Sequence, residues 1–576
     1  ADDQITAIEY WPTGLVKKVT QPDGAFTAYT YDAAHRLTDI ADNAGNTIHY
    51  TLDNAGNRTA ESTKDAGNTL RRTLSRVYNQ LGQLQTAKDA YNHATGFTYD
   101  ANGNNQTVTD ALSRVSDNDY DPLNRLVQTL QDVGGIAAQT SFAYDAQDNL
   151  TKVTDPKGLD TTYTYNGFSD LTQLSSPDTG VTTYTYDSAG NRQTQTDARG
   201  VTATYSYDAL NRLTGIGYPT SSLDVAYAYD TVNASCLAGE TFAIGRLTKM
   251  TDSSGQTEYC YDRFGNLTRK RQTTNGQVFT VRYAYTLAGQ LQAITYPDGA
   301  VVDYVRDGQG RTTEVGVTPN GGTRSVLLNQ ATYYPFGPVA SWTYGNGRTM
   351  SRSLNQNYQP LAIQDPNAGG LSLGYEFDEV GNLKKLFNAD QSVTKAQYGY
   401  DALNRLTDVK DGPTGTVIDH YAYDATGNRT SFTNAGGTTN YTYPSTNHRL
   451  TQVGATPRAY DSVGNTTQIG GTAKEFVYND ANRMSQVKVG GTATMNYQLS
   501  GRGEQVRQYL AANNTYTVYN EAGQWVGDYD ATGQPIQQAI WLDDLPVGLL
   551  AGATTNQKLH YLQPDHLGTP RAVIDT

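Results

Sequence analysis

Paired acidic residues are the first features of this sequence that could do chemistry. Asp543 and Asp544 are adjacent, and two neighbouring carboxylates can share general acid and general base roles. The chain carries 57 Asp and Glu residues, however, so adjacent pairs arise by chance. We therefore expect a structural role for this pair.

Metal-binding patterns are weak in this chain. Asp and Asn recur in predicted turns, as at Asp262, Asn266, Asp424 and Asn428, and oxygen-rich loops can bind calcium. The Asp spacing of an EF-hand and the glycine-rich nonapeptide of calcium β-helices are both missing, so turn capping is the favoured role. The seven histidines are scattered without metal-ligand spacing. They are His35, His49, His93, His420, His448, His560 and His566, of which only the last two flank a distinctive segment.

Motifs of common enzyme classes do not occur. The sequence contains no Gly-x-Ser-x-Gly, no phosphate-binding loop and no Cys-x-x-Cys. It therefore predicts no catalytic residue, no cofactor and no metal site, and we expect that the chain is not an enzyme. Cys236 and Cys260 lie about one repeat apart in an irregular unit. Neighbouring hairpins could join them in a disulfide, but two unpaired buried thiols are the preferred prediction.

A Tyr-Asp repeat organises the whole chain. In the most regular stretch the anchor tyrosines stand at 99, 120, 144, 165, 186, 207 and 229, which gives spacings of 21, 24, 21, 21, 21 and 22 by subtraction. Such a fixed period is typical of an array whose units bury their faces against their neighbours.

Each repeat predicts one β-hairpin. Tyrosines alternate with Thr or Ala before each Asp, as in residues 183–186, and this period of two indicates a strand. The fourth residue after the anchor tyrosine is Gly, as at Gly190, or Asn, as at Asn211 and Asn404. These residue types enter the left-handed region most readily, so they predict one common turn. The Asp after the tyrosine can accept hydrogen bonds from the backbone amides two or three residues later.

The composition favours a wide, thin sheet. Hydrophobic residues make up only 37% of the chain, but there are 43 tyrosines that can stack across Thr-rich strands. A conventional core of Leu, Ile and Val is not expected. About 50 strands cannot form a flat sheet, so the predicted fold is all-β, a long antiparallel sheet of about 20-residue hairpins coiled into a hollow cocoon-like shell.

The net charge, the lack of a long apolar run and the first residues of the chain limit the kinds of partner and protein that are expected. A net charge of -14 argues against nucleic acid or an anionic membrane as a partner. There is no apolar run long enough for a membrane-spanning segment and no signal peptide. Because the chain starts at Ala1 with strand-like sequence, we expect it to be a piece of a longer protein.

The repeats resemble those of rearrangement-hotspot (RHS), or YD-repeat, proteins over nearly the whole chain. The most specific segments are IWLDDLPV at 540–547 and DHLGTPR at 565–571, which look like the start of the family's repeat-associated core. We therefore expect a YD-repeat shell at residues 1–500 and final repeats plus the start of this core at 501–576. The resemblance implies a secreted bacterial shell that encloses a C-terminal toxin cargo from the same longer chain.

The family's autoproteolytic motif is the main departure from this pattern. It lies beyond the core, and this sequence stops at Thr576 before it could occur. The segment DPKGL at 155–159 matches half of the motif, but Leu150 stands where a proline is required. We expect an ordinary turn at 155–159 and no self-cleavage.

Three functions remain open at the level of sequence. The first is a non-catalytic shell of a polymorphic toxin, with a secretion or toxin-delivery apparatus as a partner, as in type VI secretion and bacterial competition. The alternative is a cell-surface adhesion or glycan-binding module that uses rows of tyrosine. A glycan-degrading enzyme with paired carboxylates is the least favoured.

Overall fold

The described chain is built almost entirely from β-strands. The computed structural model describes residues 3–575, which contain 52 strands and no α-helix. Three short 3₁₀ segments occur: η1 (Ser221–Leu223), η2 (Gly471–Ala473) and η3 (Thr554–Asn556). The predicted all-β repeat fold is confirmed.

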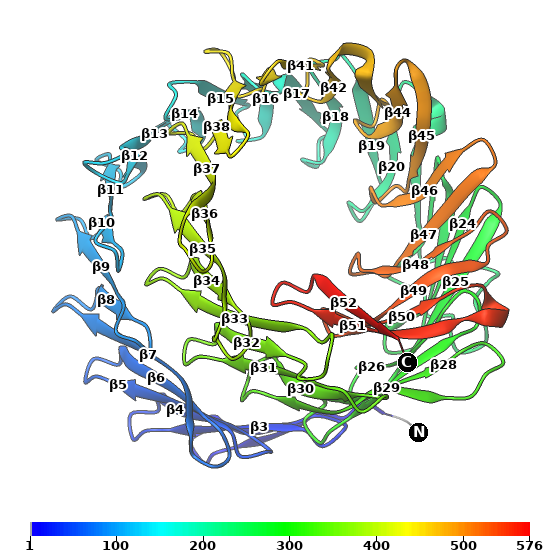
Figure 1. Cartoon of the computed structure of the whole chain (residues 1–576), viewed down its shortest axis with the longest axis horizontal. Helices are drawn as coiled ribbons and strands as arrows, with labels where there is room; N and C mark the ends of the chain where they lie inside the picture. Colours follow the sequence, from blue (N-terminus) through cyan, green and yellow to red (C-terminus); the bar gives the residue numbers. More distant parts are fainter. Residues whose placement is uncertain (1–2, 576) are drawn as a thin grey trace.

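The strands form one antiparallel meander. Each strand pairs with the next along the chain, from β1 (Ala7–Tyr10) with β2 (Val16–Thr20) to β51 (Lys558–Pro564) with β52 (Pro570–Asp575). Only hairpin turns are needed to connect such a sheet. Figure 1 shows the meander running around an open centre more than twice.

The sheet meets itself again after each circuit. Arg263 Nη2 lies 3.4 Å from Asp3 Oδ1, and Asn43 Nδ2 donates to the carbonyl of Gly308, 265 residues later. The chain passes this part of the sheet once more near Tyr516, whose Oη accepts a hydrogen bond from Asn275 Nδ2. We call residues 3–262 the first circuit, 263–512 the second circuit and 513–575 the third arc.

The first circuit contains strands β1 to β23. After β1 and β2 these are β3 (Phe26–Tyr31), β4 (Leu37–Asp42), β5 (Thr47–Leu52), β6 (Arg58–Lys64), β7 (Leu70–Tyr78), β8 (Leu84–Lys88), β9 (Ala94–Tyr99), β10 (Asn105–Thr109), β11 (Val115–Tyr120), β12 (Leu126–Gln131), β13 (Ala138–Tyr144), β14 (Leu150–Thr154), β15 (Asp160–Tyr165), β16 (Leu171–Ser176), β17 (Gly180–Tyr186), β18 (Arg192–Thr196), β19 (Thr202–Tyr207), β20 (Leu213–Gly217), β21 (Val225–Tyr229), β22 (Leu247–Asp252) and β23 (Gly255–Tyr261).

The second circuit contains strands β24 to β46. They are β24 (Leu267–Thr274), β25 (Gln277–Tyr285), β26 (Leu291–Thr295), β27 (Val301–Arg306), β28 (Thr312–Thr318), β29 (Ser325–Tyr333), β30 (Val339–Tyr344), β31 (Thr349–Leu354), β32 (Pro360–Gln364), β33 (Ser372–Phe377), β34 (Leu383–Phe387), β35 (Thr394–Tyr400), β36 (Leu406–Asp411), β37 (Val417–Tyr423), β38 (Arg429–Asn434), β39 (Gly437–Thr442), β40 (Gln452–Val453), β41 (Thr456–Tyr460), β42 (Thr466–Ile469), β43 (Lys474–Tyr478), β44 (Met484–Val489), β45 (Thr492–Leu499) and β46 (Gln505–Leu510).

The third arc packs against the start of the second circuit. It comprises β47 (Asn513–Tyr519), β48 (Trp525–Tyr529), β49 (Pro535–Leu542), β50 (Leu545–Ala551), β51 and β52. The residue separation across the contacts falls from 243 between Tyr296 and Ala539 to 218 between Tyr344 and Leu562. The coil therefore tightens toward its C-terminal end, and β51 and β52 lie on the inner side of β29 and β30 in Figure 1.

An apolar core fills the space between these two layers. Its residues include Phe279, whose ring lies 4.9 Å from that of Tyr529, and the fully buried Trp342 and Ile540. The expectation that a conventional core is missing is wrong for this region. The overall composition hides it, because the buried aliphatic and aromatic residues gather in two segments, at 279–375 and 516–561.

Candidate functional site

The Tyr-Asp turn is the unit from which the wall is built. In the turn after β17, Asp187 Oδ1 accepts the amides of Ala189 and Asn191, both at 2.9 Å. Asn191 Nδ2 donates to Asp187 Oδ2 at 3.0 Å, and Gly190 between them has φ of 82°. One carboxylate thus fixes the whole turn from both of its oxygens.

The Leu-Asn-Arg variant forms the same turn. Asp208 Oδ1 accepts the amides of Leu210 and Arg212, at 2.9 and 3.0 Å, while Arg212 Nε donates to Oδ2 at 2.7 Å. Asn211 has φ of 59°, so the prediction of one turn with a positive-φ residue is confirmed. The bonded amides lie two and four residues after the Asp, however, rather than two or three. Sequence reasoning also missed that the residue after the positive-φ position, Asn or Arg, donates to the same Asp.

These bonds stabilise the ionised carboxylates. The pKa of Asp187 is lowered, first by the amide side chain of Asn191. The pKa of Asp208 is lowered as well, first by the backbone N–H of Arg212. Hydrogen bonds that favour a charged carboxylate have this effect in general.

The anchor tyrosines tie each hairpin to the one before it. Tyr186 Oη donates to the carbonyl of Leu171 at 2.8 Å, and Tyr400 Oη donates to that of Leu383 at 2.9 Å. The same bond, to the carbonyl of the first residue of the immediately preceding strand, recurs from Tyr99, Tyr144, Tyr229, Tyr261, Tyr285 and Tyr423. Tyrosine therefore contributes a specific bond to the wall as well as apolar area.

Basic side chains join the two circuits edge to edge. Arg114 Nη2 donates to Asn404 Oδ1 at 2.9 Å, and Arg199 Nη1 donates to the carbonyl of Asn479 at 2.8 Å. Lys157 Nζ donates to the carbonyls of Pro444 and Asn447. In each case a cation from a turn between hairpins of the first circuit binds oxygens at a turn of the second circuit. We call this line of contacts the seam.

The segment at 155–159 is one of these seam turns. Asp155 Oδ1 accepts the amides of Lys157 and Leu159, and the amide of Gly158 donates to the carbonyl of Asp155 at 2.9 Å. His448, from the second circuit, places Nε2 2.9 Å from Asp155 Oδ2. The geometry is that of the predicted turn.

The carboxylate pair near the end of the chain also forms a turn. Asp543 and Asp544 connect β49 to β50 where Leu542 pairs with Leu545, and Asp543 has φ of 53°. Burial raises the pKa of Asp543. The two carboxylates therefore lie on adjacent residues of a hairpin turn, and their structural role stays a prediction.

The two histidines near the core motif have different partners. His560 Nδ1 lies 2.7 Å from Asp575 Oδ1. The ring of His566 lies 4.6 Å from that of Tyr375, and burial lowers the pKa of His566. Within residues 3–575, no group of three or more His, Cys, Asp or Glu is placed to hold a metal ion.

The cysteines are paired, so the preferred prediction of two free thiols is wrong. Cys236 and Cys260 form a disulfide with Cα atoms 5.5 Å apart. The insertion between β21 and β22 folds back over β23, which a count of repeats could not show. Glu240 of this insertion also pairs with Arg269, at 2.9 Å from its Nε.

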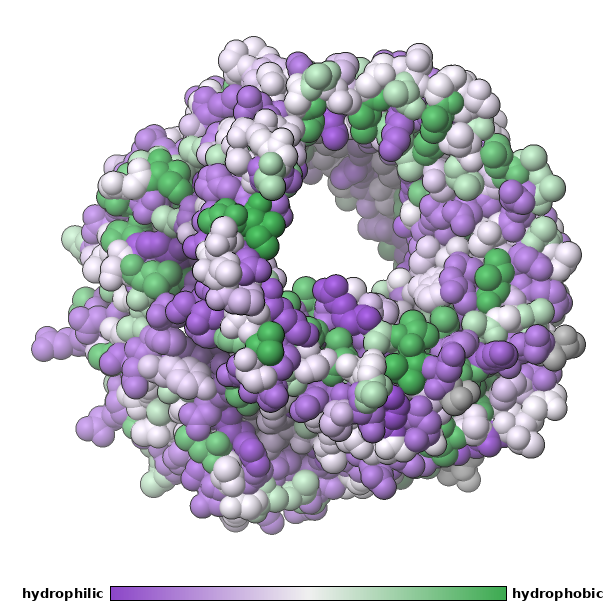
Figure 2. All heavy atoms as spheres, in the orientation of Figure 1, coloured by the Kyte–Doolittle hydropathy of each residue, from purple (hydrophilic) through white to green (hydrophobic). Residues whose placement is uncertain are grey.

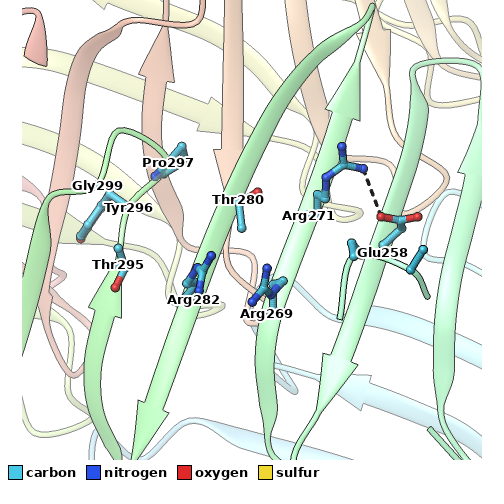
Figure 3. A pocket seen from close by; sticks show the side chains of 11 residues that line it. Glu258, Arg269, Arg271, Thr280, Arg282, Thr295, Tyr296, Pro297 and Gly299 are labelled. Atoms are coloured by element: carbon cyan, nitrogen blue, oxygen red, sulfur yellow. Dashed lines mark hydrogen bonds and ion pairs between the residues drawn. The ribbon is translucent and has the colours of Figure 1, made fainter. Parts of the chain in front are cut away.

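A polar pocket of about 770 Å³ lies beside this insertion. Arg269, Arg271 and Arg282 line it from β24 and β25, as Figure 3 shows, and Glu258 pairs with Arg271 at 3.1 Å. The lining offers positive charge and hydroxyl groups that suit an anion. These arginines were not candidates from the sequence, because Arg282 comes to lie beside Arg269 only through the pairing of β24 with β25.

Two sequence families match the chain. The family described as Teneurin YD-shell matches residues 361–576. The RHS Repeat family matches residues 10–47, 31–69, 144–181, 165–202, 186–222, 243–278 and 261–301. No curated protein sequence matches the chain. The described residues contain no helix with the length and apolar character to cross a membrane.

Solved structures of toxin components share the fold. The Tc holotoxin pore of Photorhabdus luminescens with a mutated TccC3 has a TM-score of 0.77 at 15% identity, covering 99% of this chain and 33% of that chain. TcdB2-TccC3 without its hypervariable C-terminal region has a TM-score of 0.75 at 15% identity, with 99% and 34% covered. The chain thus spans about a third of the length of these relatives. The chain is therefore similar to the RHS Repeat and Teneurin YD-shell families over the matched residues, and it shares the coiled-sheet fold of these solved structures.

Proposed function

We propose that this chain is part of the wall of a shell that encloses a toxin domain, a C-terminal cargo from the same longer polypeptide. The observation that carries the proposal is the continuous sheet, which closes edge to edge through the seam and surrounds an open centre. Figure 2 shows that this centre is a wide opening, so these residues form a ring of wall rather than a sealed chamber.

The course of the third arc supports the proposed cargo position. The arc leaves the plane of the wall and packs face to face on the second circuit, where Tyr344 Oη donates to the carbonyl of Leu562. Its last two strands, β51 and β52, lie on the inner side of the ring in Figure 1. A segment that continues from β52 would therefore start from the inner layer.

The relatives support the same reading by analogy. One of them is described as lacking a hypervariable C-terminal region, so a shell and a variable C-terminal part occur together in that protein. We propose the same arrangement here, with residues 1–500 as repeat shell and 501–576 as final repeats and start of the core. Secretion by bacteria, a delivery apparatus such as type VI secretion, a role in bacterial competition and a non-catalytic wall are parts of this proposal.

Protease protection tests this function. The protein is produced with its natural continuation beyond Thr576 and is treated with a nonspecific protease under native conditions. The continuation should survive while exposed turns are cut, and it should become sensitive once the wall is unfolded. The free continuation, expressed alone, is the control and should be digested at once. Digestion of the attached and free forms at equal rates would contradict encapsulation, and an adhesion role would then lead.

A further inference from the structure

The polar pocket beside the insertion between β21 and β22 has a positively charged floor. Strand pairing builds this floor in two rows on one face of the sheet. Arg269 lies directly opposite Arg282, and Arg271 lies opposite Thr280. Thr295 on β26 lies opposite Arg282 and extends the first row. All of these residues line the pocket, and Figure 3 shows the arginine side chains next to one another on β24 and β25.

The arginines of the pocket are not all neutralised. Glu240 pairs with Arg269 at 2.9 Å, and Glu258 pairs with Arg271 at 3.1 Å. Arg282 is exposed, and within residues 3–575 its side chain has no hydrogen bond or ion pair. Like charges directly opposite each other on paired strands destabilise a sheet. The position of Arg282 opposite Arg269 is therefore unfavourable for the fold, and no contact among the described residues offsets it.

The pocket also holds hydroxyl groups that can donate hydrogen bonds. Ser235, in the insertion, lines the pocket with an Oγ atom that is buried and has no hydrogen-bond partner among the described residues. Thr280 and Thr295 add two further hydroxyls to the lining. Burying a hydroxyl without a partner is unfavourable, so most buried hydroxyls have one. The pocket thus provides donors, and lacks an acceptor for them.

The pocket lies on the face of the sheet that is turned away from the third arc. Successive residues of a strand point to opposite faces. Lys270 lies between Arg269 and Arg271 on β24, and its Nζ donates to the carbonyl of Tyr519 in the third arc at 3.0 Å. A ligand in the pocket and a cargo placed as proposed above would therefore occupy opposite faces of the sheet.

We propose that this pocket binds the phosphate or sulfate ester group of a small soluble molecule that carries hydroxyl groups. The planar guanidinium of Arg282 can bond two oxygens of such a group at once. The hydroxyls of Ser235 and Thr280 can bond its remaining oxygens or the hydroxyls of the ligand. The volume of about 770 Å³ is in the range of small-molecule sites.

Other features of the pocket limit the class of ligand. Tyr296 is part of the lining, but it is 3% exposed and its hydroxyl donates to the carbonyl of Ala539 in the third arc. The lining residues therefore offer no aromatic face on which a nucleobase could stack. The net charge of -14 disfavours an anionic membrane. A sugar phosphate or sugar sulfate fits both limits.

Calorimetric titration of the 576-residue chain at low ionic strength tests the site. The probes are glucose 6-phosphate and glucose 6-sulfate, with glucose as the neutral control. At least one ester should bind with a Kd of about 1 mM or below, and glucose should not bind. The ester that binds more tightly identifies the preferred group. Arg282→Gln should weaken this binding about tenfold or more, because a charge-assisted bond is lost.

A matched variant controls for the loss of charge. Arg192→Gln removes an exposed arginine from β18, far from the pocket in sequence, and should leave the affinity unchanged. Absence of binding by both esters, or an equal loss in the two variants, would overturn the proposal. Binding to phosphatidylglycerol vesicles without binding to either soluble ester would also overturn it, in favour of a membrane surface.

The variant Ser235→Ala separates a ligand site from a structural role. It should weaken ester binding about threefold or more, the effect of one neutral hydrogen bond, without lowering the melting temperature. Arg282→Gln should not lower the melting temperature either, because it removes a like charge opposite Arg269. Unchanged binding by Ser235→Ala, or a less stable Arg282→Gln variant, would contradict the assignment. None of these results depends on the protease assay, so the pocket and encapsulation can fail separately.

Discussion

Arg114 and Asn404 are 290 residues apart in the sequence, and a 2.9 Å hydrogen bond joins them across the seam. The bond relates a turn between hairpins in the first circuit to a Tyr-Asp turn in the second. Because comparable contacts recur at Lys157 and Arg199, the wall is held together by turn chemistry as well as by strand pairing.

The seam cations should hold the circuits together. Replacing Arg114, Lys157 and Arg199 by Met should weaken the contact by about 1 kcal/mol per cation, the size of a modest hydrogen bond to a charged donor. Hydrogen exchange should then accelerate at 401–404, 444–447 and 479–480. Arg192→Met, within a first-circuit strand, is the control and should leave these turns unchanged. Unaltered exchange in the triple variant would refute the role of the cations.

The positive-φ position should reject branched residues. Gly190→Val should destabilise the wall by about 1 kcal/mol or more through left-handed strain. A Cβ at Gly190 meets nothing within 4 Å, so the cost is conformational and not steric. Gly190→Asn should be tolerated, because Asn211 occupies the same position. Denaturant unfolding of the two variants checks this prediction, and equal losses for Val and Asn would contradict it.

Acid should weaken the turns. The folded-state pKa values of Asp187, Asp208 and Asp424 are lowered, for Asp187 chiefly by Asn191 and for Asp208 chiefly by the amide of Arg212. Carboxyl groups with lowered folded-state pKa values contribute stability that is fully present above their ordinary pKa. This contribution is lost as pH falls below the ordinary value, from about pH 4 downward. Melting temperature measured against pH should therefore be level near pH 6 and fall below pH 4. A fall that is complete above pH 5 would point to groups other than these carboxylates.

High pH should destabilise the protein through ionisation of the buried tyrosines. Burial raises the pKa of Tyr261, Tyr285 and Tyr375 to about 12. Since an unfolded tyrosine ionises near pH 10, their contribution to stability is present below about pH 10 and is lost as pH rises toward 12. Absorbance titration should show a late class of tyrosines that merges with the exposed class once the protein is unfolded. A single early transition in the native protein would exclude such a class.

The disulfide should stabilise the insertion locally. Cys236 and Cys260 are separated by 24 residues, and closing a loop of this size contributes about 3 kcal/mol in the chain-entropy account. The double variant Cys236→Ser and Cys260→Ser should show faster hydrogen exchange at 231–245, while turns at 401–404 keep their protection. If reductant leaves exchange of the parent protein unchanged at 231–245, the bond does not hold the insertion.

The repeat predicts the local fold because turn and strand are encoded within a few residues. The residue types Gly190 and Asn211 predict the positive-φ turn, and the alternating tyrosines predict the strand. The seam could not be foreseen, because it depends on the number of residues in a circuit, which the accumulated twist of many strands determines. Arg114 and Asn404 gave no sign that they meet. The pairing of Cys236 with Cys260 and the core around Trp342 were missed for the same reason, since each depends on how irregular or distant segments fold back.

Encapsulation is tested most directly by electron cryomicroscopy of the protein with its continuation beyond Thr576. The account predicts a ring wall with the course seen in Figure 1 and additional density within its centre that is connected to β52. The density should be lost when the continuation is deleted, with the wall unchanged. An empty centre with the continuation projecting outside the ring would contradict the account.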